Sequence, residues 1–322
     1  MAVRRVTPGA RRRRALLGLV GCLLAVAACG SPPADPAPRA PRATGTTYRV
    51  WQWNVAGNTL HHGSTTDRLP EAAAASITER NIDFAAFNEV CHGQFQRIRQ
   101  NLIDAGWPED PDTFDRFEPG LPGGDPEICG GDSYGIALFS KAPLGPADRR
   151  TLPDDGTGEP RKLLCAPLAK TPHRRLCTTH IGISQEVADN GKLYSANQLD
   201  DVLDTVERYH AAGDTVILAG DFNAQPTYDR LWPYQTRHGG HYRELDDSDK
   251  GHCPGYGEWT ADDVPGTAPP CGDKAKIDMI FVREDRIAGP YSADALPIPR
   301  GCTGTPACSD HRILTGTVVL KD

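Results

Sequence analysis

Polar side chains suited to phosphoester chemistry recur in this 322-residue sequence where apolar, strand-like segments stop. A single polar residue at such a position is usually only a turn former, but here the set is large: Asn54, Glu89, His180, Asp221, Asn223, Asp278, Asp310 and His311. Carboxylates and amides without a thiolate are the ligands that hard cations such as Mg²⁺, Mn²⁺ or Ca²⁺ prefer. Two histidines add proton transfer or phosphate contact near neutral pH. The set therefore predicts a divalent cation, Mg²⁺ first, and the hydrolysis of phosphoesters.

The segments that must position these residues alternate between strand and helix early in the chain and are mostly strands later. Alternating apolar, β-branched and aromatic residues predict strands over 48–55, 82–87, 133–140, 215–218, 277–282 and 313–320, with a hairpin of 162–168 and 176–181. Apolar residues at helical spacing, together with stop signals, predict helices over 69–79, 94–105 and 193–211. This order predicts an α/β fold with mixed rather than purely parallel pairing, in one domain.

Seven short motifs occur in an order that resembles a known superfamily. They are Trp53-Asn54, Phe87-Asn88-Glu89-Val90, residues 134–141 (YGIALFSK), Thr179-His180, Gly220-Asp221-Phe222-Asn223, residues 277–281 (IDMIF) and Ser309-Asp310-His311. From about Tyr48 onward the chain resembles the endonuclease/exonuclease/phosphatase superfamily, with its deoxyribonuclease I-like fold. The resemblance implies a four-layer α/β sandwich, two packed mixed β-sheets flanked by helices, with the site at one rim of the sheets.

The resemblance also implies roles around the metal and the phosphate. Glu89 would be the main metal carboxylate, with Asn54 beside it and Asp310 helping to hold the cation. Asp221 would orient or deprotonate the attacking water, and Asn223 would hold the phosphate.

Two histidines and one carboxylate complete the implied site. His311 would contact the phosphate or act as acid and base, and Asp278 would orient its imidazole. His180 would be the second histidine on the phosphate side. A carboxylate behind an imidazole fixes its tautomer and favours its cationic form.

The motifs also depart from two branches of the superfamily. The abasic-site endonuclease branch usually has a further metal carboxylate after Trp-Asn, where this chain has Val55-Ala56-Gly57. The inositol polyphosphate phosphatase branch tends to have Asp-Leu-Asn, whereas residues 221–226 read DFNAQP. The sequence is therefore more similar to the nuclease and general phosphodiesterase branches.

The charge pattern bears on the substrate. The chain has 35 basic and 42 acidic residues, and six of the arginines lie in residues 1–28, which contain no acid, so the remainder has a net charge of −13. Such a protein must meet a polyanion through a metal or a local basic patch. Between residues 148 and 175, seven basic residues face four acidic ones. Two interpretations stay open: an ordinary solvated hairpin, or contact with a phosphate backbone through Arg149, Arg150, Arg174 and Arg175.

These observations predict a metal-dependent phosphoesterase, an extracellular nuclease in the first place. The alternative is a lipid phosphodiesterase of the sphingomyelinase type or a small-molecule phosphatase. A third class, a binding module without turnover, is disfavoured because every motif retains its polar ligands. We expect the protein to act as a monomer on a phosphoester substrate, and nucleic acid is the favoured candidate.

The N-terminus predicts export. Residues 1–28 combine an arginine-rich start with a 14-residue apolar run, which is too short to span a bilayer of about 30 Å. The run ends in Val26-Ala27-Ala28-Cys29, which resembles a lipoprotein signal, so Cys29 is the expected lipidation site and residues 29–47 a proline-rich tether to a domain over 48–322. An ordinary signal peptide or a twin-arginine signal is the alternative. We expect the protein to be attached to the outer face of the cell membrane by the lipid anchor alone, or to be released into the medium.

The remaining cysteines agree with export. Eight follow Cys29, and an even number in an exported chain predicts disulfides. Local pairing favours Cys165–Cys177, Cys253–Cys271 and Cys302–Cys308, which leaves Cys91–Cys129. A zinc site is the competing interpretation, disfavoured because no CxxC occurs.

Two further polar groups are interpreted as surface features. His61 and His62 are expected to be an exposed loop pair. Asp246, Asp247 and Asp249 resemble a calcium loop only faintly, and a solvated turn is expected there.

Overall fold

Alternation of side chains along the strands builds the first of two six-stranded sheets. The computed structural model describes residues 44–248, 254–266 and 274–322. In β1 (Gly45–Asn54), Val50 points to one face while Trp51 and Trp53 point to the other, as a period of two requires. The sheet has the order β13-β14-β1-β2-β4-β3, in which β2 is Phe84–Cys91, β3 Asp115–Leu121, β4 Tyr134–Ser140, β13 Ile287–Leu296 and β14 Ile313–Lys321.

The second sheet has the order β5-β6-β7-β8-β12-β9. Its strands are β5 (Asp148–Thr151), β6 (Lys162–Pro167), β7 (Arg174–His180), β8 (Thr215–Asp221), β12 (Asp278–Arg283) and β9 (Tyr242–Glu244). A small two-stranded sheet pairs β10 (Ala261–Pro265) with β11 (Lys274–Ala275). Short 3₁₀ helices lie at Cys129–Gly131, Asp229–Leu231, Thr236–His238 and Glu284–Arg286. Parallel pairs occur between β1 and β2 and between β7 and β8, and the other strand pairs are antiparallel, so both large sheets are mixed.

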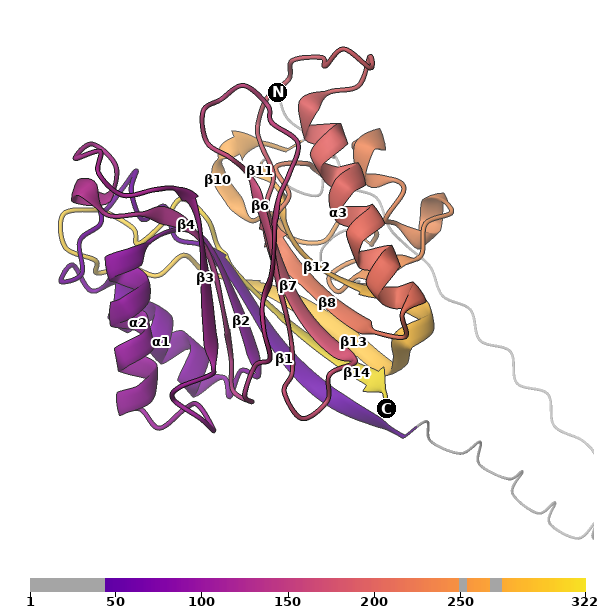
Figure 1. Cartoon of the computed structure of the whole chain (residues 1–322), viewed down its shortest axis with the longest axis horizontal. Coiled ribbons are helices and arrows are strands. Elements are labelled where there is room, and N and C mark those ends of the chain that lie inside the picture. The colour runs from indigo at the N-terminus through magenta and orange to yellow at the C-terminus, as the bar shows by residue number, and fades with distance from the viewer. Residues whose placement is uncertain (1–43, 249–253, 267–273) are drawn as a thin grey trace, which may run out of the picture. The chain divides into compact units, whose positions relative to one another are not determined.

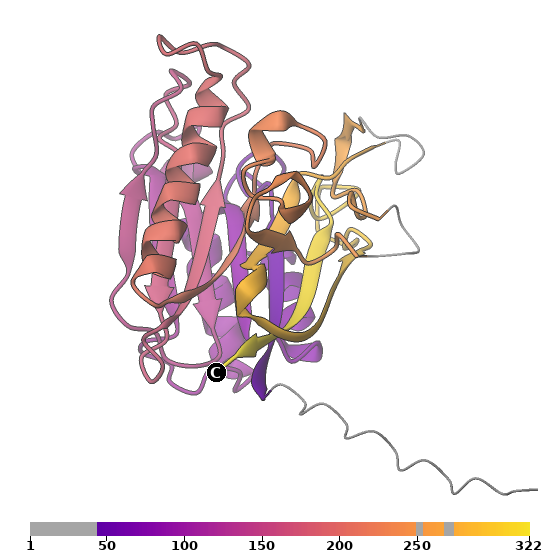
Figure 2. The ribbon, with the colours of Figure 1, turned by 90° about the vertical axis from the view of Figure 1, so that its right-hand side faces the viewer.

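Three hydrophobic clusters hold the sheets and helices in four layers (Figures 1 and 2). Helices α1 (Leu69–Glu79) and α2 (His92–Asp104) pack on the outer face of the first sheet, over Trp51 and Phe87. Helix α3 (Tyr194–Ala211) packs on the outer face of the second sheet. The inner faces meet in a cluster that includes Phe84 and Ile217. The fold is therefore the predicted four-layer α/β sandwich. None of the described helices is both long and apolar enough to cross a membrane.

The structure contains three of the four predicted disulfides. Cys91–Cys129, Cys165–Cys177 and Cys302–Cys308 have Cα–Cα distances of 5.7, 4.1 and 5.2 Å. The hairpin register explains the second pair, because Cys165 lies directly opposite Cys177 on β6 and β7. Cys253 and Cys271, Cys29, the signal segment 1–28 and most of the tether lie outside the described residues.

Two surface interpretations from the sequence are wrong at His61 and at Asp246, whereas His62 is exposed as expected. His61 is buried: its Nε2 lies 3.0 Å from the Cys308 carbonyl oxygen, and its Nδ1 contacts the Asp67 carboxylate. Asp246 is fully buried and pairs with Lys276 rather than with water, so it does not belong to a solvated turn. Asp249 lies outside the described residues. In both cases a distant part of the chain covers a polar loop, which local sequence does not reveal.

Candidate active site at the rim of the two sheets

Strand register brings the predicted site residues to one rim. On the second sheet, Asp221 at the end of β8 lies opposite His180 on one neighbouring strand and Asp278 on the other. On the first sheet, Asn54 ends β1 opposite Asn88 of β2. Adjacent strands lie about 4.8 Å apart, so side chains in register at the strand ends are near neighbours.

Two buried amides, Gln52 and Asn88, connect the sheets beneath the rim. The Asn88 side chain donates to the Thr179 carbonyl oxygen at 2.9 Å and accepts from the backbone N–H of Asp221 at 2.8 Å. Gln52 donates to Asn88 Oδ1 at 2.6 Å and lies 3.3 Å from Asp278 Oδ1. Sequence analysis gave these residues no role. The signal for Gln52 was available, since it is a polar residue pointing inward from an otherwise apolar strand face.

Glu89 and Asp221 meet at the amide of Asn54. Asn54 Nδ2 donates to Glu89 Oε1 at 2.9 Å and to Asp221 Oδ2 at 3.0 Å. Glu89 has a backbone φ of 56° and Asn223 a φ of 44°, both in the left-handed region that non-glycine residues rarely adopt. Such strain persists only where surrounding structure fixes it, and it clusters at functional sites.

His311 and Asp278 form a buried pair beside Asp221. His311 Nδ1 lies 2.7 Å from Asp278 Oδ2, and its Nε2 lies 3.9 Å from Asp221 Oδ2. Burial by itself would lower the pKa of His311, but the charges of Asp278 and Asp221 outweigh it and raise that pKa to about 10. Ser309 holds the segment, because its Oγ donates to the Asn54 carbonyl oxygen at 2.7 Å and accepts from the His311 N–H at 3.0 Å. His311 is therefore a cation whose free Nε2 faces the site.

His180 behaves in the opposite way, because its neighbours are Arg161 and His311. Arg161 Nη1 lies 3.1 Å from His180 Nδ1, and it can only donate, so Nδ1 accepts and the ring proton is on Nε2. Burial, and then the charges of Arg161 and His311, hold the pKa of His180 well below its usual range. Nε2 lies 3.7 Å from Asp221 and 3.8 Å from Glu89. Arg161 was part of the basic segment but not of the predicted site. Only the packing of β6 against β7 reveals its place.

A divalent cation fits this donor set. Ligand atoms of Asp221, Asp278 and His311 lie within 4.8 Å of one another. Because a protonated His311 has no lone pair to offer, the carboxylates are the groups here that could hold a cation. Burial, followed by the charge of Asp278, raises the pKa of Asp221 to about 7. A bound cation would favour the charged form of this carboxyl. Solvent can reach the site at Glu89, because the Glu89 side chain is 21% exposed, whereas that of Asp221 is 2% exposed. Asp310 follows Ser309, whose hydroxyl lies 3.4 Å from its carboxylate.

The four arginines expected to contact substrate lie elsewhere. Arg174 and Arg175 begin β7, whereas His180 ends it. Arg149 pairs with Glu118 at 2.9 Å, Arg150 with Asp201 at 2.6 Å and Arg175 with Asp214 at 2.9 Å. The structure thus places none of the four with the rim residues: Arg149, Arg150 and Arg175 are paired with acids, and Arg174 is buried.

Known proteins share this architecture. The model of the Endonuclease/Exonuclease/phosphatase family matches residues 51–311. Among solved structures, truncated TDP2 of Caenorhabditis elegans is 17% identical, with a TM-score of 0.57 over 85% of this chain and 97% of that chain. D. rerio TDP2 complexed with single strand DNA product is 18% identical, with a TM-score of 0.56 over 85% and 99%. A family protein of Bacteroides thetaiotaomicron is 13% identical, with a TM-score of 0.58 over 86% and 98%. Comparison with curated proteins finds no match.

Proposed function

This chain belongs to the Endonuclease/Exonuclease/phosphatase family. On that premise we propose that it is a metal-dependent phosphoesterase and that its substrate is nucleic acid. The observation that carries the proposal is the rim itself. Glu89 and Asp221 converge on Asn54, while the Asp278–His311 pair presents a cationic nitrogen beside them. Carboxylates for a hard cation and an imidazolium for the phosphate are what phosphoester hydrolysis requires.

The carboxylates would act on the cation and on water. Glu89, with Asn54 and Asp310 nearby, would hold a divalent cation, Mg²⁺ first, which supplies charge neutralisation at the phosphate when bound. Asp221 would orient the attacking water and accept its proton. A pKa near 7 suits a general base that works near neutral pH.

The nitrogen-bearing side chains would act on the phosphate. His311, kept cationic by Asp278, would contact a phosphate oxygen and protonate the leaving oxygen. His180 would lie on the phosphate side of the site, with Arg161 donating to its Nδ1. Asn223 lies on the same side, with its Nδ2 3.3 Å from His180 Nε2 and 2.9 Å from the Ile181 carbonyl oxygen.

Nucleic acid is supported by a structural neighbour, D. rerio TDP2, which was solved with single strand DNA product. A specific observation favours a second candidate, a lipid phosphodiesterase. Ile183 and Val187, in the loop that follows His180, are 65% and 60% exposed. Exposed apolar side chains beside a site are suited to contact with a lipid surface.

The deciding experiment compares substrates under matched metal conditions. The purified protein is incubated with plasmid, single-stranded DNA, RNA, sphingomyelin vesicles and inositol phosphates, with Mg²⁺ and with EDTA. Cleavage of nucleic acid that EDTA abolishes supports the proposal, and full activity in EDTA contradicts it. An Ile183→Ser/Val187→Ser variant separates the candidates. It should retain nuclease activity, whereas a lipid enzyme would lose activity on vesicles.

We also propose that the protein is exported and anchored through Cys29, on the support of its N-terminal sequence. Two acyl chains hold a protein durably at a membrane, whereas one binds reversibly. Cys29→Ser should move the protein from the membrane fraction to the medium, and unchanged fractionation would contradict the anchor.

A further inference from the structure

We propose that the end of the sandwich opposite the rim carries a second site, a pocket for a phosphate group built around Arg174. A cavity of about 450 Å³ lies there, lined by Thr46, Tyr48, His173, Arg174, Arg286 and Lys321 among others. Arg174 begins β7 and His180 ends it, so the pocket lies roughly 20 Å along the strand from the candidate active site. Figure 1 shows the start of β1 and the end of β14 side by side at this end, away from β10 and β11. The inference is independent of the proposed activity.

The central observation is a buried guanidinium with a free donor. Arg174 is only 8% exposed, lies over the ring of Tyr48 at 5.2 Å, and donates from Nη2 to the Lys321 carbonyl oxygen at 2.8 Å. Its Nη1 is buried without a hydrogen-bond partner. Leaving a charged donor buried and unpaired costs free energy. A ligand that supplies acceptor oxygens would offset that cost, and a guanidinium suits phosphate well.

The charges around Arg174 favour an anion. Arg286 and Lys321 add two further cations to the lining. The one acidic lining residue, Asp322, already accepts a hydrogen bond from Thr46 Oγ1 at 2.8 Å. Three permanent cations against the side-chain and terminal carboxylates of Asp322 leave a net positive charge at this pocket in a protein with a formal charge of −7. A dianionic phosphate fits that balance.

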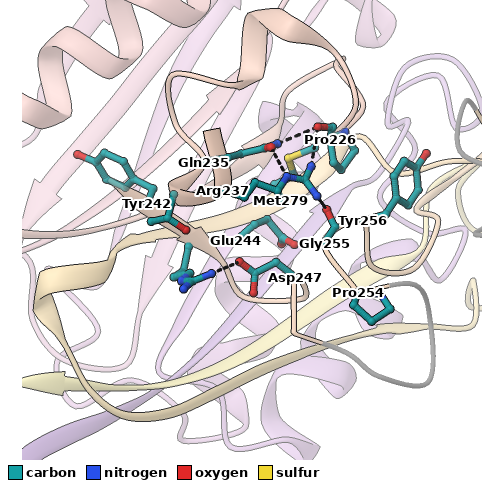
Figure 3. A pocket seen from close by; sticks show the side chains of 12 residues that line it. Pro226, Gln235, Arg237, Tyr242, Glu244, Asp247, Pro254, Gly255, Tyr256 and Met279 are labelled. Carbon is teal, nitrogen blue, oxygen red and sulfur yellow. Dashed lines mark hydrogen bonds and ion pairs between the residues drawn. The ribbon is translucent and has the colours of Figure 1, made fainter. Parts of the chain in front are cut away.

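A second cavity, shown in Figure 3, is lined by arginines that are already paired. It measures about 290 Å³, and Arg237 projects into it. That guanidinium donates to Gln235 Oε1 at 2.7 Å, to the Pro226 carbonyl oxygen at 2.8 Å and to the Gly255 carbonyl oxygen. Arg243 is paired with Glu284 and Asp247. These arginines tie loops together. In the Arg174 pocket, Arg286 Nε and Lys321 Nζ also have partners, His210 Nδ1 at 3.3 Å and the Asp285 carbonyl oxygen at 2.6 Å, whereas the buried Nη1 of Arg174 has none.

Two sources could supply the phosphate: a soluble phosphorylated molecule or the headgroup of an anionic lipid. Thr46 and Tyr48 line the pocket; Thr46 lies at the end of the proline-rich segment 29–47, and Tyr48 directly follows that segment. If Cys29 anchors the chain, the pocket stands at the point where the domain leaves its tether. The experiment therefore has one arm for each source.

The first arm measures binding of inorganic phosphate by calorimetry on the full chain in EDTA. We compare the wild type with Arg286→Gln/Lys321→Gln, and use Arg97→Gln as a control that removes an exposed arginine paired with Glu71 on the helical face. The pocket variant should weaken binding by at least about tenfold, as the loss of charge-assisted bonds predicts. The control should not. Phosphodiesterase activity should be unchanged in both. An unchanged dissociation constant in the pocket variant would overturn the proposal, because any binding would then belong to another site.

The second arm measures flotation with vesicles of phosphatidylcholine alone or with phosphatidic acid, on the Cys29→Ser chain so that no anchor contributes. Flotation that needs phosphatidic acid and is lost in Arg286→Gln/Lys321→Gln identifies a lipid headgroup as the source. Phosphate binding without flotation identifies a soluble ligand. Binding in neither arm refutes the pocket. Arg174→Gln tests the central residue, and the double variant stands in for it if that substitution prevents folding.

Discussion

Two clusters of buried carboxylates lie along β12, and they differ in where their positive charge comes from. Asp278, the first residue of β12, belongs to the rim site. Glu244 accepts from the Ile280 N–H of the same strand and belongs to an internal cluster with Asp246 and Lys276. The rim site would take a metal ion as its cation, whereas the internal cluster has the ammonium group of Lys276.

The internal cluster is closed to solvent. Lys276 Nζ lies 3.2 Å from Asp246 Oδ2 and 3.6 Å from Glu244 Oε2, and the Lys276 and Asp246 side chains have no exposed surface. Asp246 also accepts from the Glu258 N–H at 2.7 Å. A buried lysine of this kind fastens the loop 245–247 and the segment before β12 together.

The rim site has no such lysine. Over the ranges that the structure describes, Glu89, Asp221 and Asp278 form ion pairs with histidines alone. Glu89 retains an exposed edge. Both clusters contain buried acids, so burial does not distinguish them. The rim site differs because solvent reaches Glu89 and because no lysine or arginine is ion-paired with its carboxylates in the described residues.

Removing the fixed cation should have the largest effect. Lys276→Met leaves the Asp246 carboxylate buried without its counter-ion, so the free energy of unfolding should fall by about 3–5 kcal/mol. Urea denaturation measures it. Lys274→Met is the matched control, since Lys274 is two residues away with a side chain 37% exposed, and should cost under about 1 kcal/mol. Equal losses in the two variants would contradict the distinction between the clusters.

Removing a carboxylate from the rim should affect activity instead. Glu89→Gln should lower the rate of phosphodiester cleavage by about 10²–10³-fold, roughly 3–4 kcal/mol of barrier, because metal charge and orientation are lost. Its urea midpoint should stay at or above that of the wild type. Glu71→Gln, an exposed acid on α1, is the control and should retain full activity. A large loss of stability in Glu89→Gln would mean that the rim is structural as well.

The pH dependence of stability sharpens the view of the internal cluster. Burial, despite the opposing charge of Lys276, raises the pKa of Glu244 to about 8. The folded protein therefore keeps this proton between pH 4.5 and 8 while the unfolded chain loses it, so this group's contribution to stability is lost as pH rises through that window. Glu244→Gln cannot lose a proton. Its stability relative to the wild type should therefore improve between pH 5 and pH 8 by at least about 1 kcal/mol, measured by urea unfolding. A constant difference would show that Glu244 is ionised throughout.

A cation outside both clusters should matter least. Arg149 is 45% exposed and paired with Glu118 on the neighbouring edge strand β3. Arg149→Gln should change KM for plasmid by less than about twofold and stability by under about 0.5 kcal/mol. A KM increase of an order of magnitude at unchanged kcat would restore the backbone-contact interpretation of the 148–175 segment.

Several elements followed from the sequence because their signals are local. The helix predicted over 69–79 is α1 to the residue, and the predicted hairpin pairs Cys165 with Cys177 as expected. Strands of central position were all recognised from alternating apolar side chains. The placing of the site at one rim came from the family resemblance, and the register of β7 with β8 and of β1 with β2 agrees with it.

The strands that sequence analysis missed are β3, β5, β9 and β13, which are edge strands of the two large sheets, and both strands of the small sheet, β10 and β11. β3 contains Pro119 and β13 contains Pro290, which an edge tolerates because one side of the strand needs no ladder hydrogen bond. Apolar and polar residues alternate only weakly along these strands, because each strand has a neighbouring strand on one side only and few of its side chains are buried. Edge strands therefore become visible only when the sheet that they complete is known.

Charge partners were decided by the tertiary structure alone. The sequence shows a basic segment, but it cannot show that Arg161 meets His180, that Arg150 meets Asp201 or that Arg174 lies beneath Lys321. A period of two along a strand is a local property, so the sequence by itself determines which side chains share a face and which share an end. Which cation meets which anion depends on how two sheets and a distant helix pack, since electrostatic pairing acts across residues far apart in the chain. For that reason the chemistry of the rim could be predicted from residue types, whereas the closed Lys276 cluster and the open Arg174 pocket could not.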